Sequence, residues 1–310
     1  MNIPIKWAYL AVFVGVCGHA SSEFFARLTG VAGPEVSVWR YLIGAAGLLV
    51  WSLMRSDTRD LVTPLKEDWR ILIPLSLVGV SLAYLLFHWS LDFASVIQVA
   101  TLVTTIPIFV GLINLAVNRT PISTVKIVTG VLAVAGVAAL LTDGYLDVLT
   151  ADGNSLWGVL MAVFCAALVA GYSVIAKPLM VRHGSMRITT LAITIGAIGL
   201  WVGVGAFWGV WVNPLSLGEK PTVAIWSLIV LGFWNTTVTQ LLWLGGLAAA
   251  NDMTRASYLF FLKPVIAAGL AIVFLGDSPT WLQLAAIAVV SGSVFVEVFW
   301  PQRQPVLKPK

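Results

Sequence analysis

Charged residues are scarce in this sequence. Asp, Glu, Lys and Arg make up 10% of the 310 residues, and 59% of the residues are hydrophobic. A soluble domain of average composition carries roughly 25% charge, so this chain cannot cover a water-facing surface. Its apolar runs approach the roughly 20 residues that a helix needs to cross about 30 Å of hydrocarbon. The composition excludes a soluble protein and predicts a polytopic membrane protein.

Other absences remove whole classes of function. Both cysteines, Cys17 and Cys165, fall in hydrophobic segments, so neither a disulfide framework nor a metal site is expected. The sequence has no phosphate-binding P-loop, so ATP-driven transport is not implied, and it has no HExxH motif. It also lacks paired acids at nuclease or glycosidase spacing and a Gly-x-Ser-x-Gly turn. We therefore expect neither an enzyme nor a cofactor.

Hydropathy predicts ten membrane-spanning segments joined by short connections. They are 7–27, 36–54, 70–90, 95–117, 122–141, 155–177, 187–211, 222–246, 253–274 and 279–299. The first resembles a signal peptide that would end at Gly18-His19-Ala20. We interpret it as a retained helix, because cleavage would leave nine segments and break the repeat described below.

Lysine and arginine predict the orientation of the chain, because they accumulate on the cytoplasmic side of a membrane protein. With the N-terminus inside, 14 of the 18 basic residues fall on the cytoplasmic side. Arg27, Arg40 and Lys220 fall outside, and Lys263 lies in mid-membrane. Both termini are therefore expected to be cytoplasmic, in a bacterial-type cytoplasmic (inner) membrane. The net charge of +4 reflects these loops and does not indicate binding to nucleic acid.

The two halves of the sequence resemble each other. The stretches TLVTTIPIFVGLINLAVNRTP (101–121) and YLFFLKPVIAAGLAIVFLGDSP (258–279) carry Pro107 and Pro264 at the same place. Each half holds five segments, an odd number, so the second half must enter the membrane from the opposite face. We predict a first repeat over 1–148, an inverted repeat over 149–300 and a cytoplasmic tail over 301–310. Inverted repeats are common in alternating-access transporters, with the substrate near the midplane.

Three stretches of this sequence carry a resemblance to a known family. They are WRYLIGAAGLL with Arg40, FLKPVIAAGLAIVFLGD with Lys263, and the small-residue segment that follows each prolyl segment. The chain resembles the EamA family of the drug/metabolite transporter superfamily over nearly its whole length. The resemblance implies an all-α polytopic membrane protein of ten helices, in two inverted five-helix repeats around a central cavity. It also implies export of small metabolites, and YddG-type exporters of aromatic and neutral amino acids are the most similar members. The family often has Gly-Glu after the prolyl helix, whereas this chain has Asn118-Arg119 and Gly276-Asp277.

Lys263 and Pro264 stand together in an apolar run. A lysine at the bilayer centre costs about 2.5–3.5 kcal/mol on insertion scales, and a broken helix at that depth is tolerated only beside a cavity or other protein. The pair therefore predicts a cavity wall. Lys263 either attracts a substrate carboxylate or pairs with Glu23 and holds helices together. Pro107 and Pro264 are the predicted hinges about which the two halves rock.

Two further pairs have the spacing i, i+4, which places both members on one face of a helix. His19 and Glu23 could carry a coupling proton, or form a buried pair that fixes helix packing. Tyr84 and His88 could form a substrate wall, or belong to the aromatic belt at the membrane interface.

Hydrogen-bonding and aromatic side chains complete the candidate site. Asn235, Gln98 and Thr105 could orient the substrate, or act as contacts between helices. Tyr172 and Phe260 could contact its side chain. The expected partners are a small-molecule substrate and the bilayer, with a possible homodimer through the segments 122–141 and 279–299. Uptake, drug export and lipid handling stay open as alternatives.

Overall fold

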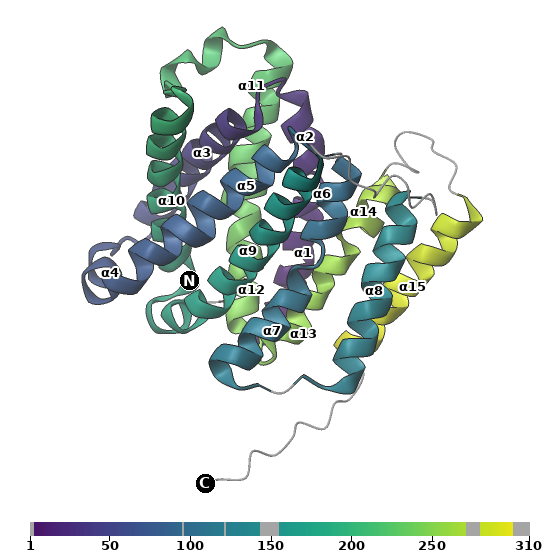
Figure 1. Cartoon of the computed structure of the whole chain (residues 1–310). Helices are drawn as coiled ribbons and strands as arrows, with labels where there is room; N and C mark the ends of the chain where they lie inside the picture. The colour runs from purple at the N-terminus through teal and green to yellow at the C-terminus, as the bar shows by residue number, and fades with distance from the viewer. Residues whose placement is uncertain (1–2, 95, 121, 143–154, 271–279, 300–310) are drawn as a thin grey trace.

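The computed structural model describes residues 3–94, 96–120, 122–142, 155–270 and 280–299, which form helices joined by short connections (Figure 1). The first half contains η1 (Ile5–Trp7), α1 (Ala8–His19), α2 (Ser22–Leu28), α3 (Gly33–Leu53), α4 (Val62–Ser76), η2 (Leu77–Leu82), α5 (Ala83–Ser90), α6 (Val96–Val103), α7 (Ile106–Asn118) and α8 (Thr124–Thr142). The second contains α9 (Ser155–His183), α10 (Ser185–Trp208), η4 (Pro214–Glu219), α11 (Thr222–Ile229), η5 (Val230–Val238), α12 (Thr239–Ala249), α13 (Met253–Ser257), η6 (Tyr258–Phe261), α14 (Leu262–Leu270) and α15 (Trp281–Phe299).

Ten membrane spans account for these elements. Eight helical stretches are long and apolar enough to cross a bilayer, namely Ile5–Ala26, Gly33–Leu53, Val62–Ser90, Val99–Asn118, Leu156–His183, Ser185–Trp208, Thr222–Ala249 and Trp281–Phe299. The apolar helix α8 and the run from α13 to α14 complete the ten. The all-α, ten-helix fold is thus confirmed.

Several spans are irregular, which hydropathy did not predict. The predicted first span, 7–27, is found at Ile5–Ala26, but it is interrupted where α1 ends at His19 and α2 begins at Ser22. The Gly18 carbonyl at this break accepts a hydrogen bond from the Asn235 side chain, with 2.5 Å between Nδ2 and O. The predicted segment 95–117 is likewise divided into α6 and α7. Irregular backbone at membrane depth needs such partners from neighbouring helices.

Corresponding spans of the two halves share one irregularity. The span from α4 to α5 contains the π-helical stretch η2, and the span from α11 to α12 contains the π-helical stretch η5. In η5 the hydroxyls of Thr236 and Thr237 donate to the carbonyls of Leu231 and Gly232, five residues back along the chain. π-Helical turns are rare and often occur at functional sites.

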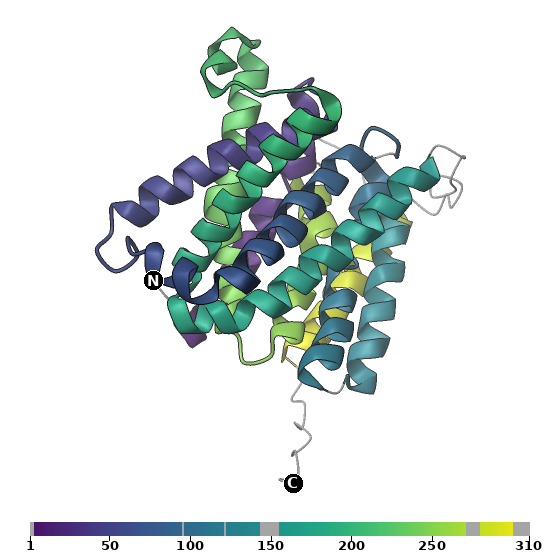
Figure 2. The same ribbon diagram turned by 60° about the vertical axis from the view of Figure 1, so that its left-hand side comes forward.

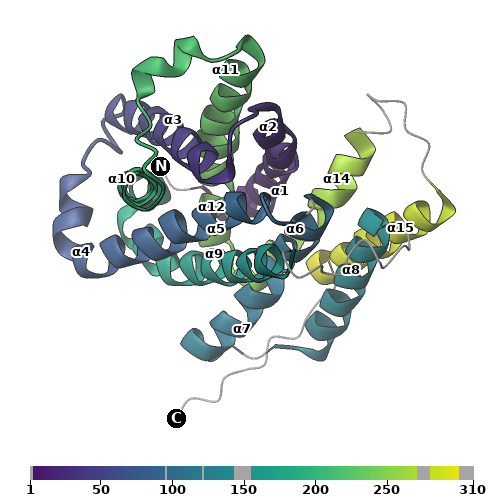
Figure 3. The same cartoon turned by 45° about the horizontal axis from the view of Figure 1, so that its top comes forward.

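Helices of one half pack mainly against helices of the other. The most extensive pairs are α8 with α15, α1 with α12, α3 with α10 and η5, and α9 with both α5 and α7. Figure 2 shows α9 (teal) crossing the helices of the first half, and Figure 3 shows α4 and α15 at opposite margins of the bundle. Rocking of the two sequence halves as rigid bodies would separate all of these pairs. The rocking of the halves about Pro107 and Pro264 stays a prediction.

Close packing between α1 and α12 depends on glycine. A Cβ atom added at Gly246 would lie 2.7 Å from Val12 Cγ2 and 2.8 Å from the Ala8 carbonyl oxygen. Small residues let helix backbones approach in a membrane, where packing takes the place of the hydrophobic effect. In contrast, a Cβ atom added at Gly203 of α10 meets no atom within 4 Å.

We expect Gly246→Ala to destabilise the protein by about 1–3 kcal/mol, because the added methyl group forces α1 and α12 apart. Gly203→Ala is the matched control and should leave stability unchanged or slightly raised. Thermal unfolding of the purified protein in detergent measures both variants. Equal melting temperatures for Gly246→Ala and wild type would show that this contact does not limit the packing.

Candidate functional site

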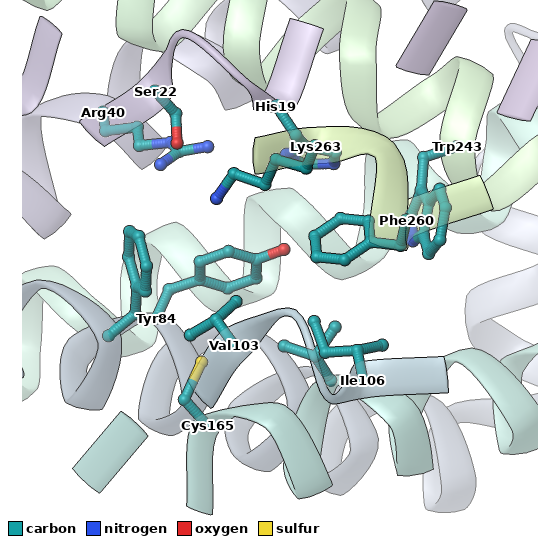
Figure 4. A pocket seen from close by; sticks show the side chains of 12 residues that line it. His19, Ser22, Arg40, Tyr84, Val103, Ile106, Cys165, Trp243, Phe260 and Lys263 are labelled. Carbon is teal, nitrogen blue, oxygen red and sulfur yellow. The ribbon is translucent and has the colours of Figure 1, made fainter. Parts of the chain in front are cut away.

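A small cavity lies inside the bundle, where several of the irregular spans meet (Figure 4). Its volume is about 30 Å³. Its lining residues are His19, Ser22, Arg40, Tyr84, Phe87, Val103, Ile106, Cys165, Val169, Trp243, Phe260 and Lys263. A single water needs roughly 10–15 Å³ on this scale, so the cavity has room for about two waters and must open to admit a metabolite.

Eleven of the twelve lining residues come from two groups of helices, each drawn from both halves of the sequence, and the twelfth is Arg40 of α3. One group is α1, α2, α12, η6 and α14, which contributes His19, Ser22, Trp243, Phe260 and Lys263. The other is α5, α6, α7 and α9, which contributes Tyr84, Phe87, Val103, Ile106, Cys165 and Val169. Helices of both sequence halves therefore contribute to each of the two groups.

Lys263 lines the cavity, at the place where the sequence predicted a cavity wall. Its side chain is buried, and its Nζ atom lies 6.0 Å from the ring centroid of Phe87 and 5.8 Å from that of Phe260. Aromatic faces attract an ammonium group electrostatically, more strongly where water is excluded. The two rings therefore help to hold the charge of Lys263 at the cavity surface.

Arg40 is the main residue that sequence reasoning missed, because it was counted among the outer basic residues. It lies seven residues into α3, roughly 10 Å along the helix axis, and is 1% exposed. Its Nε donates to Thr236 Oγ1 at 3.0 Å, its Nη1 to His88 Nε2 at 3.3 Å and its Nη2 to the Asn235 carbonyl at 3.3 Å. The signal in the sequence was a charge inside the apolar run SVWRYLIGAAGLLVW.

His19 lines the cavity beside two aromatic rings. Its ring meets Trp243 edge-on with centroids 6.1 Å apart, and Phe260 with centroids 5.7 Å apart. The side chain is 6% exposed, and among the described residues Nε2 has no hydrogen-bond partner. The side chain of Glu23 lies outside the described residues, so the predicted proton-coupling pair stays a prediction.

The other predicted residues divide into those at the cavity and those behind it. Tyr84 and Phe260 line the cavity, and the Tyr84 hydroxyl accepts from Gln240 Nε2 at 2.5 Å. Four predicted residues contact other groups. Asn235 bonds Gly18 and Ser21, His88 bonds Arg40, Tyr172 packs beside Gly79, and Thr105 donates to the Leu102 carbonyl. The side chain of Gln98 lies outside the described residues.

The two predicted hinge prolines follow irregular backbone. Pro107 is the second residue of α7, directly after the break that follows α6. Pro264 is the third residue of α14, directly after the 3₁₀ turn η6. Their neighbours Ile106 and Lys263 line the cavity. The hinge role of the prolines stays a prediction.

Polar contacts close the end of the bundle that carries the N-terminus. Lys126 of α8 forms an ion pair with Asp252 just before α13, with 2.5 Å between Nζ and Oδ2. The Tyr258 hydroxyl donates to the Lys126 carbonyl, and Asn114 Nδ2 donates to Thr254 Oγ1 at 3.3 Å. The Lys126 side chain is 6% exposed. These contacts join α7 and α8 to the start of the α13–α14 span.

Comparison with known proteins agrees with this architecture. The EamA-like transporter family matches the chain twice, over residues 6–142 and 156–299. The chain belongs to the EamA-like transporter family. It is therefore a membrane transporter and not an enzyme, and the double match corresponds to its two five-helix halves.

Relatives of this EamA-like transporter are also described as transporters, and their names state no substrate. An uncharacterised transporter of Archaeoglobus fulgidus is 23% identical over 259 residues, which cover 83% of this chain and 85% of the relative. The uncharacterised inner membrane transporter YhbE of Escherichia coli is 22% identical over 193 residues, covering 62% of this chain and 60% of the relative. A crystal structure with 17% identity superposes with a TM-score of 0.76, covering 94% of this chain and 96% of the other. That likeness concerns the fold alone.

We expect Asp252→Asn to loosen this closed end of the EamA-like transporter, because it leaves the Lys126 ammonium buried without its carboxylate. Cys165 lines the cavity, so its reaction rate with a hydrophilic maleimide reports opening. With Cys17→Ser present to leave one thiol, the rate should rise about tenfold, the effect of roughly 1.4 kcal/mol.

Two variants control this measurement in detergent-purified protein. Asp57→Asn removes the carboxylate of an exposed pair with Arg55 and should leave the rate unchanged. The exchange Lys126→Asp with Asp252→Lys should restore slow labelling. An Asp252→Asn rate equal to that of the parent would show that the ion pair does not hold this end closed.

Proposed function

We propose that this EamA-like transporter exports small metabolites, and specifically aromatic and other neutral amino acids, by alternating access. The central cavity carries the proposal, since it combines the buried ammonium of Lys263 with the rings of Phe87, Trp243 and Phe260. A carboxylate can pair with the ammonium while an apolar side chain contacts the rings. This chemistry suits the cargo of YddG-type exporters.

The proposed roles follow the positions of the side chains. Lys263 binds the carboxylate, and Phe260 and Tyr84 contact the rest of the amino acid. Gln240 fixes the Tyr84 hydroxyl and so orients it. Asn235 and His88, first assigned to the substrate, act on Gly18 and Arg40 instead. Their contribution is to hold the cavity walls in place.

Alternating access in this proposal separates helix groups and not sequence halves. The group of α1, α12 and α14 moves against the group of α5, α6, α7 and α9, because these groups face each other across the cavity. Pro107 and Pro264 lie next to irregular turns, where backbone angles can change at the lowest cost in hydrogen bonds. His19 and Glu23 are the proposed carriers of a coupling proton. Without such coupling, export follows the substrate gradient.

Two alternatives fit the cavity less well. A cationic drug would meet Arg40 and Lys263, and like charges at close range in a low-dielectric site repel strongly. Lipid handling would need a path from the cavity to the bilayer. An apolar groove of about 450 Å³ does lie between α1 and α15, lined by Tyr9, Leu10, Phe13, Leu259, Leu262, Ser291, Val294, Phe295, Val298 and Phe299. None of these residues lines the central cavity.

We also propose an inner-membrane location with both termini in the cytoplasm. The proposal is based on the distribution of lysine and arginine and on the similarity to the inner membrane transporter of Escherichia coli.

A homodimer would use the outer faces of α8 and α15. Ala135, Ala288 and Gly292 are exposed on these faces, whereas Gly136 packs against Val290 within the chain. Small exposed residues permit close helix contact between two copies.

Efflux from proteoliposomes tests the proposal. Vesicles loaded with labelled phenylalanine, tryptophan or leucine should show saturable efflux with the wild-type protein. Lys263→Ala should slow this efflux about tenfold or more, because it removes one charged contact to the carboxylate. Efflux that survives the mutation would remove the carboxylate role of Lys263, and no efflux of any amino acid would contradict the proposed cargo.

A further inference from the structure

Arg40 carries a buried charge whose hydrogen-bond partners are all neutral. The guanidinium stays protonated in proteins, and the residue is 1% exposed. Its acceptors are a threonine hydroxyl, a histidine nitrogen and a backbone carbonyl. Within the part of the chain that the structure describes, Arg40 forms no ion pair. Burying a charge without a counter-charge is unfavourable, so an anion that binds beside Arg40 would be stabilised by its charge.

His88 orients the guanidinium and does not balance its charge. Arg40 Nη1 donates to His88 Nε2, so that nitrogen is an unprotonated acceptor. The other ring nitrogen, Nδ1, lies 2.9 Å from the Tyr84 carbonyl and 2.8 Å from Ser37 Oγ, and therefore carries the hydrogen. His88 is thus a neutral imidazole held between a backbone acceptor and the arginine.

Arg40 has donors left over that a carboxylate could use. A guanidinium has five N–H groups, and Nε, Nη1 and Nη2 each donate one to a protein acceptor. One N–H therefore remains on each of Nη1 and Nη2, and guanidinium N–H groups of this kind can donate to the oxygens of a carboxylate. The guanidinium carbon lies 5.7 Å from the ring centroids of both Tyr41 and Tyr84, which restricts its movement. In Figure 4 the nitrogen ends of Arg40 and Lys263 point into the same space.

We propose that Arg40 binds the acidic group of the cargo and that the transporter recognises its cargo as an organic acid. This inference rests on the proposed function and identifies the carboxylate as the group of the cargo that the site recognises. No lining side chain in the described part of the chain is acidic, so an ammonium group on the cargo gains no ion pair from those residues. His19 Nε2, buried and without a described partner, is placed to bond a polar group beside the carboxylate. Apolar and aromatic acids without an amino group are then cargo, as well as amino acids.

A ligand series on the wild-type protein tests the inference without a mutation. The series is 3-phenylpropionate, L-phenylalanine, L-phenylalanine methyl ester and 2-phenylethylamine, and binding is measured as ligand-dependent thermal stabilisation in detergent. We expect the two carboxylates to bind within about threefold of each other. The ester and the amine should bind roughly 10- to 100-fold more weakly, the usual effect of losing a charge-assisted hydrogen bond. An ester or amine that binds as well as the acid would overturn the inference, as would a lack of binding by both carboxylates.

Variants then assign the effect to Arg40. Arg40→Gln should weaken 3-phenylpropionate binding by roughly 10- to 100-fold, and Arg40→Lys should restore part of it, because lysine keeps the charge but not the fork. Arg70→Gln removes an exposed arginine and is the control. Elution as a single species and an unchanged helix signal establish that each variant is folded. If Arg40→Gln does not fold, Arg40→Lys and the wild-type ligand series decide the question. Full binding by a folded Arg40→Gln would contradict the inference.

The two proposals can fail separately. Phenylalanine efflux that survives Arg40→Gln and is matched by the methyl ester would retain the exporter and remove the arginine from recognition. Arg40-dependent binding of 3-phenylpropionate, with no efflux of any amino acid, would retain the arginine site and remove amino acids as cargo.

Discussion

The bilayer core offers no water to a backbone amide or carbonyl, and this constraint determines where the chain can be irregular. Each span can break only where other protein groups satisfy the freed backbone groups. The break after α1 has the Asn235 amide on the Gly18 carbonyl, and η5 has the hydroxyls of Thr236 and Thr237 on carbonyls five residues back. The Asn235 amide reaches Gly18 from another span, whereas Thr236 and Thr237 bond carbonyls of their own helix. The breaks at His19 and Ile106 and the turn at Phe260 all lie at the cavity. The buried charged side chains Arg40 and Lys263 line the same cavity.

The inverted repeat adds a second constraint, on motion. Because α1 pairs with α12 and α5 pairs with α9, each cavity wall is built from both halves of the sequence. A repeat unit of the sequence is thus not a separately packed unit of the structure. The Lys126–Asp252 pair joins α8 to the segment before α13, again across the halves. Closure of that end therefore depends on contacts that neither half could make alone.

The sequence predicted the fold well because membrane spans are specified by composition. Apolar runs, the bias of lysine and arginine, and the position of Pro107 and Pro264 were sufficient for ten helices in two inverted halves. Hydropathy does not report where a helix breaks, so the interruption after His19 was missed. Lys263 was found because its proline neighbour marks irregular backbone, whereas Arg40 has no such neighbour. Arg40 lies close to the start of the predicted segment 36–54, and for that reason it was counted with the basic residues outside the membrane. Asn235 and His88 were correctly seen as polar, but sequence does not show that they face Gly18 and Arg40 and not the cavity.

Two buried cations in this chain show how a structural charge differs from a binding charge. Lys126 is almost fully buried and meets the carboxylate of Asp252, so its charge is balanced within the protein. Arg40 is equally buried, yet its described partners on α5 and η5 are neutral. A balanced pair stabilises one closed arrangement and offers nothing to a ligand. Neutral acceptors fix the position of a charged group without neutralising it, so the positive charge remains available to attract an anion. Because the acceptors of Arg40 lie on α5 and η5, an acid bound to it would contact a guanidinium that joins three helical segments, α3, α5 and η5.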